Sequence, residues 1–223
     1  MIQLDYYGHS AFLLKYNGEP CLLVDPFLNE NPWQKITADE VDCEYILVSH
    51  GHGDHLGDAI EISKRTGATI ISTAEVANHC SENGATVHAM HIGGKIAFPF
   101  GWVRVTQAFH GSGLPGGHAC GFIVNFHGKT IYYAGDTGIF GDMKLLGELE
   151  TIELSLLPIG NNFTMGPEDA ALAAKMLNTQ RVVPIHYKTW PIIDQDPEKF
   201  KKDVESRHNI PVDIVLPGES IQL

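Results

Sequence analysis

The sequence has no long apolar run and no basic cluster, and both absences exclude whole classes of protein. No stretch of the 223 residues approaches the ~18 apolar residues that a membrane-spanning helix needs. No cluster of lysine and arginine is longer than two residues, as at Lys201 and Lys202, and the formal net charge is −12. The acidic chain is repelled by a nucleic-acid backbone, and no segment is apolar enough to cross a membrane. We therefore expect neither as a partner.

Cysteine is scarce, and its spacing excludes the scaffolds that depend on it. The four cysteines, Cys21, Cys43, Cys80 and Cys120, form no C-x-x-C pair, so neither a zinc ribbon nor a disulfide-stapled secreted framework is expected. The first ten residues, MIQLDYYGHS, have neither the basic head nor the apolar core of a signal peptide, and their alternation predicts a strand. We therefore expect a protein of the reducing cytoplasm.

The length and the residue pattern predict a single domain that mixes sheets and helices. With 43% hydrophobic and 19% charged residues, the chain has the size and composition of one α/β domain spanning residues 1–223. Apolar segments joined by glycine-containing turns predict three β-hairpins, at residues 11–25, 95–109 and 121–135. Helices are predicted at residues 56–66, 74–83, 143–149, 167–177 and 197–208.

Two of the predicted hairpins share a pattern. Aligning the chain with itself superimposes FLLKYNGEPCLLV, residues 12–24, on FIVNFHGKTIYYA, residues 122–134, and a Gly-His pair stands shortly before each. The match is short, so two unrelated hairpins explain it equally well. A genuine repeat predicts two similar sheets packed face to face, with helices outside.

The segment Ser49–Asp58, SHGHGDHLGD, concentrates histidine and aspartate between glycines. Clustered imidazoles repel one another when charged and add little to a core when neutral, so this density points to a metal site. In an extended H-x-H segment, His50 and His52 point the same way and can chelate one ion. Asp54 and His55, at the start of the following helix, should project differently and suit a second ion.

Other strong ligand types directly follow apolar, strand-like runs. EYILVS runs into His50, VRVTQAF into His110, TIYYAG into Asp136 and RVVPI into His186. Strand ends that converge on one edge of a sheet hold side chains rigidly, and the loops beyond them leave room for a substrate. We therefore expect His110 to complete the first metal site, His186 to complete the second and the Asp136 carboxylate to bridge both.

Several nearby residues carry weaker signals. His9 precedes the first hairpin and is interpreted either as an acid or substrate ligand in the cleft or, equally, as a buried hydrogen-bonded group. Asp25 either orients a ligand histidine or is a turn residue before Pro26. Gly51 and Gly53 permit a sharp turn and keep side chains away from the ions. Surface or structural roles are expected for His79, His88, His91, His127 and His208.

The order H-x-H-x-D-H, His, Asp, His over residues 50–186 resembles the metallo-β-lactamase superfamily of metal-dependent hydrolases. That resemblance implies the α/β class, as a four-layer αββα sandwich of two mixed β-sheets with the metal site along one edge. It assigns His50, His52 and His110 to the first metal, Asp54, His55 and His186 to the second, and Asp136 to the bridge. The segments YYGHSAFLL, LLVDPFL, LPIGNNFTMGPEDAA and VPIHYKTWP are similar to the branch that includes ascorbate-6-phosphate lactonase-like proteins.

The resemblance and the ligand set together predict a metal-dependent hydrolase with two divalent ions. The expected nucleophile is a metal-bridging hydroxide, and the expected substrate is a small, anionic ester-type molecule, either a lactone or a phosphodiester. Asp54 is expected to orient the hydroxide, and His9 or metal-bound water to protonate the leaving group. Zinc and manganese are the leading metals, with iron and nickel as alternatives, because imidazole and carboxylate ligands suit all four.

Two alternatives use the same scaffold differently. One is a non-catalytic module that binds metal without turnover, although a complete ligand set argues against lost activity. The other is a redox di-iron protein, but such relatives generally carry a fused flavin domain and an acidic residue where His52 stands. The sequence carries no legible signal for oligomeric state, and a homo-oligomer is a mild preference because relatives often assemble.

Overall fold

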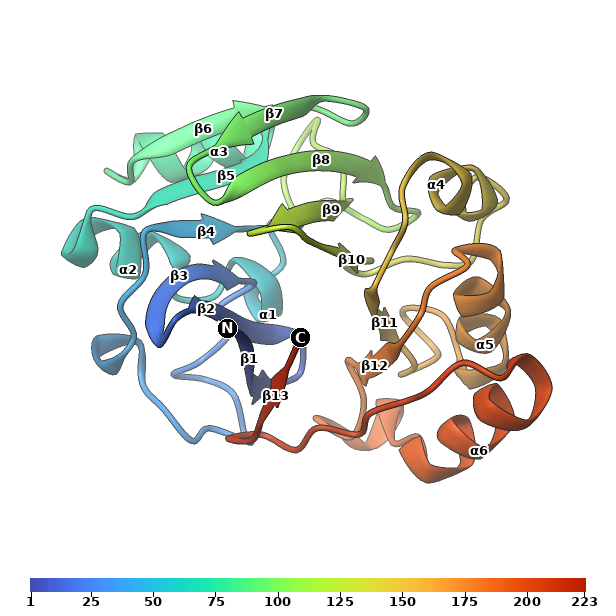
Figure 1. Ribbon diagram of the computed structural model, residues 1–223. Helices are drawn as coiled ribbons and strands as arrows, with labels where there is room; N and C mark the ends of the chain where they lie inside the picture. Colours follow the sequence, from blue (N-terminus) through green and yellow to red (C-terminus); the bar gives the residue numbers. More distant parts are fainter.

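Two mixed β-sheets packed face to face form the centre of the protein, and helices cover both outer faces (Figure 1). The computed structural model describes all 223 residues. The first sheet has seven strands, in the order β13 (Ser220–Gln222), β1 (Ile2–Gly8), β2 (Ala11–Tyr16), β3 (Glu19–Val24), β4 (Tyr45–Leu47), β5 (Thr69–Thr73) and β6 (Val87–Met90). The second has six, in the order β12 (Val182–Ile185), β11 (Leu154–Pro158), β10 (Lys129–Tyr133), β9 (Cys120–Phe126), β8 (Gly101–Gln107) and β7 (Lys95–Phe98).

The two sheets share a topology. Strand β3 is antiparallel to β2 and parallel to β4, and β10 is likewise antiparallel to β9 and parallel to β11. The three predicted hairpins are confirmed as β2–β3, β7–β8 and β9–β10. The two hairpins with matching sequences therefore occupy equivalent places in the two sheets, as the predicted repeat requires.

Helices form the outer layers on both sides of the paired sheets (Figure 1). Those on the side of the first sheet are α1 (Gly53–Leu56), α2 (Ala59–Thr66) and α3 (Ala74–Glu82), and those beside the second are α4 (Met143–Leu149), α5 (Pro167–Met176) and α6 (Pro197–His208). Single 3-10 turns occur at Ala38–Glu40 and Pro191–Ile193. None of the helices combines the length and apolar character that crossing a membrane requires.

Three hydrophobic clusters hold the four layers together. The largest has 24 buried residues and lies between the sheets, where Phe12 of one matching hairpin and Phe122 of the other are both buried. Clusters of 17 and 18 buried residues join each sheet to its own helices. The αββα sandwich therefore follows from strands that are apolar on both faces, which need cover on both sides.

One helix differs from its prediction. The helix expected at residues 56–66 is interrupted at Gly57, which has φ 42° and divides α1 from α2. A Cβ atom at Gly57 would lie 2.4 Å from the carbonyl oxygen of Pro26, so the chain passes the β3 loop too closely for a side chain. The close approach comes from a segment distant in sequence, and the local helical pattern does not reveal it.

Candidate metal centre

Parallel strand directions bring six polar side chains to one edge of the sandwich. In the first sheet β1, β3 and β4 run the same way and lead into His9, Asp25 and His50. In the second, β8, β10 and β12 share a direction and lead into His110, Asp136 and His186. The expectation that strand ends carry the site therefore holds for the two sheets together.

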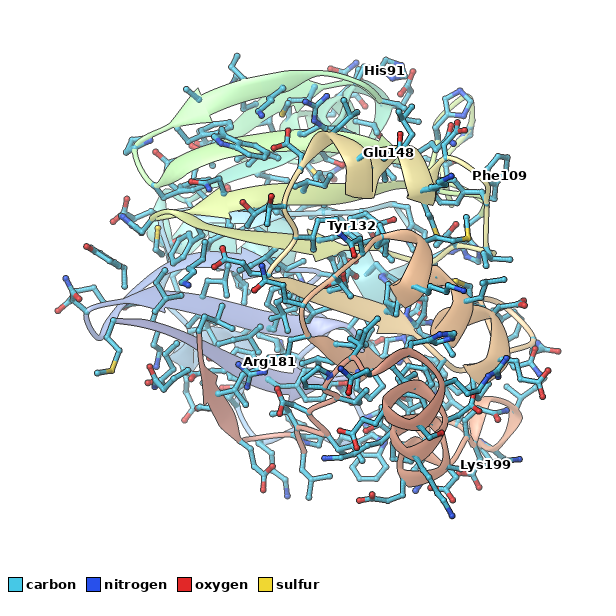
Figure 2. The ribbon with its side chains drawn as sticks, turned by 45° about the vertical axis from the view of Figure 1, so that its right-hand side comes forward. His91, Phe109, Tyr132, Glu148, Arg181 and Lys199 are labelled. Carbon is cyan, nitrogen blue, oxygen red and sulfur yellow. The ribbon has the colours of Figure 1, made fainter.

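A first group of possible ligands contains the three histidines predicted for the first metal. One ring nitrogen each from His50, His52 and His110 lies within 4.8 Å of the others. His50 Nε2 is 2.9 Å from His52 Nδ1, so the two rings of the H-x-H segment face the same point. His50 is fully buried, whereas His52 and His110 are half-buried. Phe109, directly before His110, instead projects outward with 63% of its surface exposed (Figure 2).

A second group contains the three residues predicted for the second metal and one more. Ligand atoms of Asp54, His55 and His186 lie within 4.8 Å of one another, and His9 is within the same range. Asp54 and His55 come from the four-residue helix α1. The His55 ring is 4.2 Å from that of His50, so the two groups adjoin each other. His186 reaches the group from the end of β12 in the other sheet.

Asp136 lies between the two groups. Its Oδ2 atom is 3.6 Å from His110 Nε2 of the first group. The same oxygen is 3.3 Å from His55 Nε2 and 3.1 Å from His186 Nε2 of the second group. A single carboxylate oxygen thus faces ring nitrogens from both groups, which is the placement that a bridging ligand needs.

A buried network orients His55 from behind, and the sequence reveals only part of it. Asp25 Oδ2 accepts hydrogen bonds from His55 Nδ1 at 2.7 Å, from the Ser49 hydroxyl at 2.5 Å and from the Tyr133 hydroxyl at 2.5 Å. Asp25 Oδ1 accepts from Ser49 N at 2.7 Å. The interpretation of Asp25 as an orienting partner agrees with this network, which leaves His55 Nε2 free to face the site. Ser49 adjoins the motif, but no sequence signal marks Tyr133.

His9 belongs to the hydrogen-bonded alternative rather than to an open cleft. Its side chain is fully buried, with Nε2 3.1 Å from Asp54 Oδ2 and Nδ1 2.7 Å from Thr189 Oγ1. Thr189 lies three residues beyond His186 and was not predicted, because threonine in a loop carries no distinctive signal. Five histidines were expected to have surface or structural roles, and all are half-buried or exposed: His79, His88, His91, His127 and His208.

Three of the strand-end residues have a left-handed backbone. His9 has φ 56°, Asp25 φ 39° and His186 φ 54°. Residues with side chains adopt this region at a cost of about 1–3 kcal/mol, and such residues concentrate at functional sites. All three residues directly follow a strand, so this backbone conformation is concentrated where β1, β3 and β12 end beside the two ligand groups.

Two glycines of the H-x-H-x-D-H turn have different surroundings. A Cβ atom at Gly51 would lie 2.6 Å from Leu114 Cγ, so this glycine admits the loop that follows His110. Gly53, in contrast, has no atom within 4 Å of such a position. Protein packing therefore requires glycine at Gly51 and not at Gly53, and the expectation that both keep side chains away from the ions stays a prediction.

Burial and neighbouring charges set the protonation of the metal-free site. Burial, followed by the neighbouring His55, lowers the pKa of His50 well below its usual value, and burial lowers that of His110. Burial opposes the ionisation of Asp136, but His186 and His55 outweigh it and hold its pKa well below the usual range. Burial also opposes the charged form of His55, yet Asp136 and Asp25 raise its pKa. In the metal-free site His50 and His110 are therefore neutral, whereas His55 carries a proton beside the ionised Asp136 and must lose it to bind a cation.

The donor atoms that face the centre fit metal ions. His55 Nε2 and His186 Nε2 lie close to Asp136 Oδ2 but make no hydrogen bond of good geometry, and Asp136 Oδ1 is buried without a partner. A buried polar atom left in this way costs about 1–3 kcal/mol, so several together call for another occupant. Imidazole nitrogen and carboxylate oxygen suit zinc and other divalent transition metals.

Known proteins resemble this chain in both fold and sequence. A family model described as a beta-lactamase superfamily domain matches residues 21–187. UPF0173 metal-dependent hydrolases from Natranaerobius thermophilus and Desulforamulus reducens are 49% and 52% identical to the chain, with full coverage of both chains in each case. The structure of Igni18, a metallo hydrolase from the hyperthermophilic archaeon Ignicoccus hospitalis, has a TM-score of 0.92 at 38% identity and covers 99% of this chain and 97% of its own.

These likenesses confirm the predicted superfamily and fold, whereas the narrower lactonase-like branch stays a prediction. The match extends over the whole chain, and the family model includes every residue of both ligand groups except His9. The chain therefore belongs to the beta-lactamase superfamily, within its UPF0173 metal-dependent hydrolases.

Proposed function

We propose that the protein hydrolyses a small, anionic ester-type molecule, a lactone or a phosphodiester, with two divalent metal ions. The observation that carries the proposal is the position of Asp136, whose Oδ2 lies within 3.6 Å of a ring nitrogen in each ligand group. Such a carboxylate suits a pair of ions that share one ligand. Zinc and manganese are the proposed metals.

Each proposed ligand has a defined place. His50, His52 and His110 would hold the first ion, and Asp54, His55 and His186 the second, with Asp136 shared between them. When bound, two such ions supply Lewis acidity and lower the pKa of a water toward ~7.

The protein's own groups then orient the reaction. Asp54 has 26% of its side chain exposed, against 3% for Asp136, so it is the carboxylate that can accept a hydrogen bond from an attacking water. His9 is fully buried, and we assign it to holding Asp54 rather than to contacting substrate. We assign proton delivery to the leaving group to water, because His9 is engaged with Asp54 and Asp25 is fully buried behind His55.

The decisive experiment is a hydrolysis screen of the metal-loaded protein with one panel of lactones and one of phosphodiesters. Asp136→Ala, checked for folding by circular dichroism, provides the background. Turnover of lactones alone would support attack at carbon, and turnover of phosphodiesters alone would support attack at phosphorus. Rates equal to the Asp136→Ala background on both panels, with two ions bound per chain, would contradict the hydrolase proposal and favour a metal-binding module.

We also propose a cytoplasmic location and a small-molecule substrate as the main partner. All four cysteines are unpaired and buried, which supports a reducing compartment. The formal net charge of −12 disfavours nucleic acid as a substrate. Location is tested directly by fractionation of cells that express the tagged chain.

A further inference from the structure

We propose that Thr189 is a positioning residue that holds the His9 ring in the orientation from which its imidazole donates to Asp54 and holds this carboxylate toward the second ligand group. The inference rests on the proposed function only in taking Asp54 as a metal ligand. It assigns a role to a residue outside both ligand groups.

The three side chains form one short line of contacts. Thr189 Oγ1 is 2.7 Å from His9 Nδ1, and His9 Nε2 is 3.1 Å from Asp54 Oδ2. The His9 side chain has no exposed surface and Thr189 is 7% exposed, so bulk water does not compete for either nitrogen.

The partners determine which nitrogen carries the proton. A neutral imidazole has one donor and one acceptor nitrogen, and an ionised carboxylate can only accept. His9 Nε2 faces Asp54 and must therefore be the donor. His9 Nδ1 is then the acceptor, and the Thr189 hydroxyl, which can donate or accept, donates to it.

The surroundings of His9 favour the neutral ring. Its ring centroid lies 5.8 Å from that of Phe27 and 4.9 Å from that of Trp190, both at steep angles. The imidazole of His186 is nearer, at 4.0 Å. Two apolar rings and a second imidazole offer little to a buried positive charge, whose desolvation would be costly.

The backbone of His9 is also fixed. Its carbonyl oxygen accepts hydrogen bonds from the Tyr6 hydroxyl at 2.8 Å and from His186 N at 2.7 Å. The second of these bonds ties the His9 main chain to that of His186, a proposed ligand of the same group. The imidazole can then fail to support Asp54 only by rotating its ring.

Removing the Thr189 hydroxyl should release the ring. In Thr189→Val the shape is kept but the buried Nδ1 acceptor loses its donor, so the ring can rotate to find another partner and Asp54 loses its own for part of the time. Loss of a group that orients a metal ligand typically lowers metal affinity by about 10–100-fold, and we expect about tenfold here.

The experiment combines ¹⁵N NMR of the histidine side chains in the metal-free protein with titration of Zn²⁺ alone against a chelating indicator. In the natural sequence His9 should show the neutral Nε2–H tautomer. Thr189→Val should shift or broaden the His9 ring resonances and weaken the second Zn²⁺ about tenfold, and Thr189→Ser should restore both. Thr179→Val is the matched control, because Thr179 is also buried and donates a single hydrogen bond, to Arg181 O, outside both ligand groups.

Three outcomes would overturn the proposal: an Nδ1–H tautomer at His9 in the natural sequence, a second-site affinity unchanged in Thr189→Val, or an equal loss in Thr179→Val. Both readouts are independent of turnover. A protein that shows the expected tautomer and affinity shifts but hydrolyses neither substrate panel would keep this inference and refute the proposed function.

Discussion

Leu114 Cγ lies 2.6 Å from the point where a Cβ atom on Gly51 would stand, in the turn between His50 and His52, two of the proposed metal ligands. The same loop is tied to the turn by a hydrogen bond of 2.7 Å from Gly51 N to Ser112 O. The segment after His110 is therefore packed onto the H-x-H turn, which links the geometry of all three first-group histidines.

We expect Gly51→Ala to push Leu114 and its loop away and to weaken the first Zn²⁺ while lowering stability by about 1–3 kcal/mol, the usual cost of overpacking. Unfolding in urea and Zn²⁺ titration measure the two effects. Gly53→Ala is the control, since nothing lies within 4 Å of its added methyl. The double variant Gly51→Ala/Leu114→Ala should recover most of the affinity, and failure to do so would refute the steric explanation.

Asp25→Asn should disturb His55 although Asp25 is not in the proposed ligand set. An amide has only one accepting oxygen, whereas Asp25 accepts from four donors on Ser49, His55 and Tyr133. We expect about 10–100-fold weaker binding at the second ion and a loss of about 1–3 kcal/mol in the free energy of unfolding. Isothermal titration with Zn²⁺ checks the first and urea unfolding the second. Asp213→Asn, which alters a half-exposed ion pair with Arg181, should change neither markedly.

Acid should destabilise the metal-free protein partly through His9. Burial, and then His186, lower its pKa from 6.5 to about 3 in the folded state. Between these values the unfolded chain binds a proton that the folded chain does not, so stability is retained above pH 6.5 and falls by about 1.4 kcal/mol per pH unit below it. Urea unfolding at several pH values between 6.5 and 4, with chelator present, should give a shallower slope for His9→Gln. Parallel slopes for the two proteins would contradict this account.

The contact between the two sheets should dominate stability. Leu156 of β11 is fully buried in the 24-residue cluster, and Leu156→Ala should cost about 2–5 kcal/mol of unfolding free energy. Leu145 of α4 is 51% exposed, so Leu145→Ala should cost less than about 0.5 kcal/mol. Urea denaturation of the two variants tests this contrast, and similar losses would show that the inter-sheet cluster is not the principal core.

Much of this protein was determined by local sequence. The three hairpins, the last three helices and the strand-end positions of His50, His110, Asp136 and His186 follow from patterns of a few residues, because periodic burial and turn chemistry act locally. The sequence also indicated the composition of both ligand groups, since H-x-H and D-H spacing restricts which side chains can face one point. Its resemblance to a metal-dependent hydrolase superfamily agrees with the relatives that the chain has.

Only the tertiary structure decided the support around those ligands. The break at Gly57, the contact of Leu114 with Gly51, the Tyr133 hydroxyl behind His55 and the Thr189 hydroxyl behind His9 all join segments that are distant in sequence or lie in loops. Such contacts depend on how two sheets meet and on where each loop closes. Single residues with ordinary local preferences carry no sign of them, because their positions are set by packing across the whole fold.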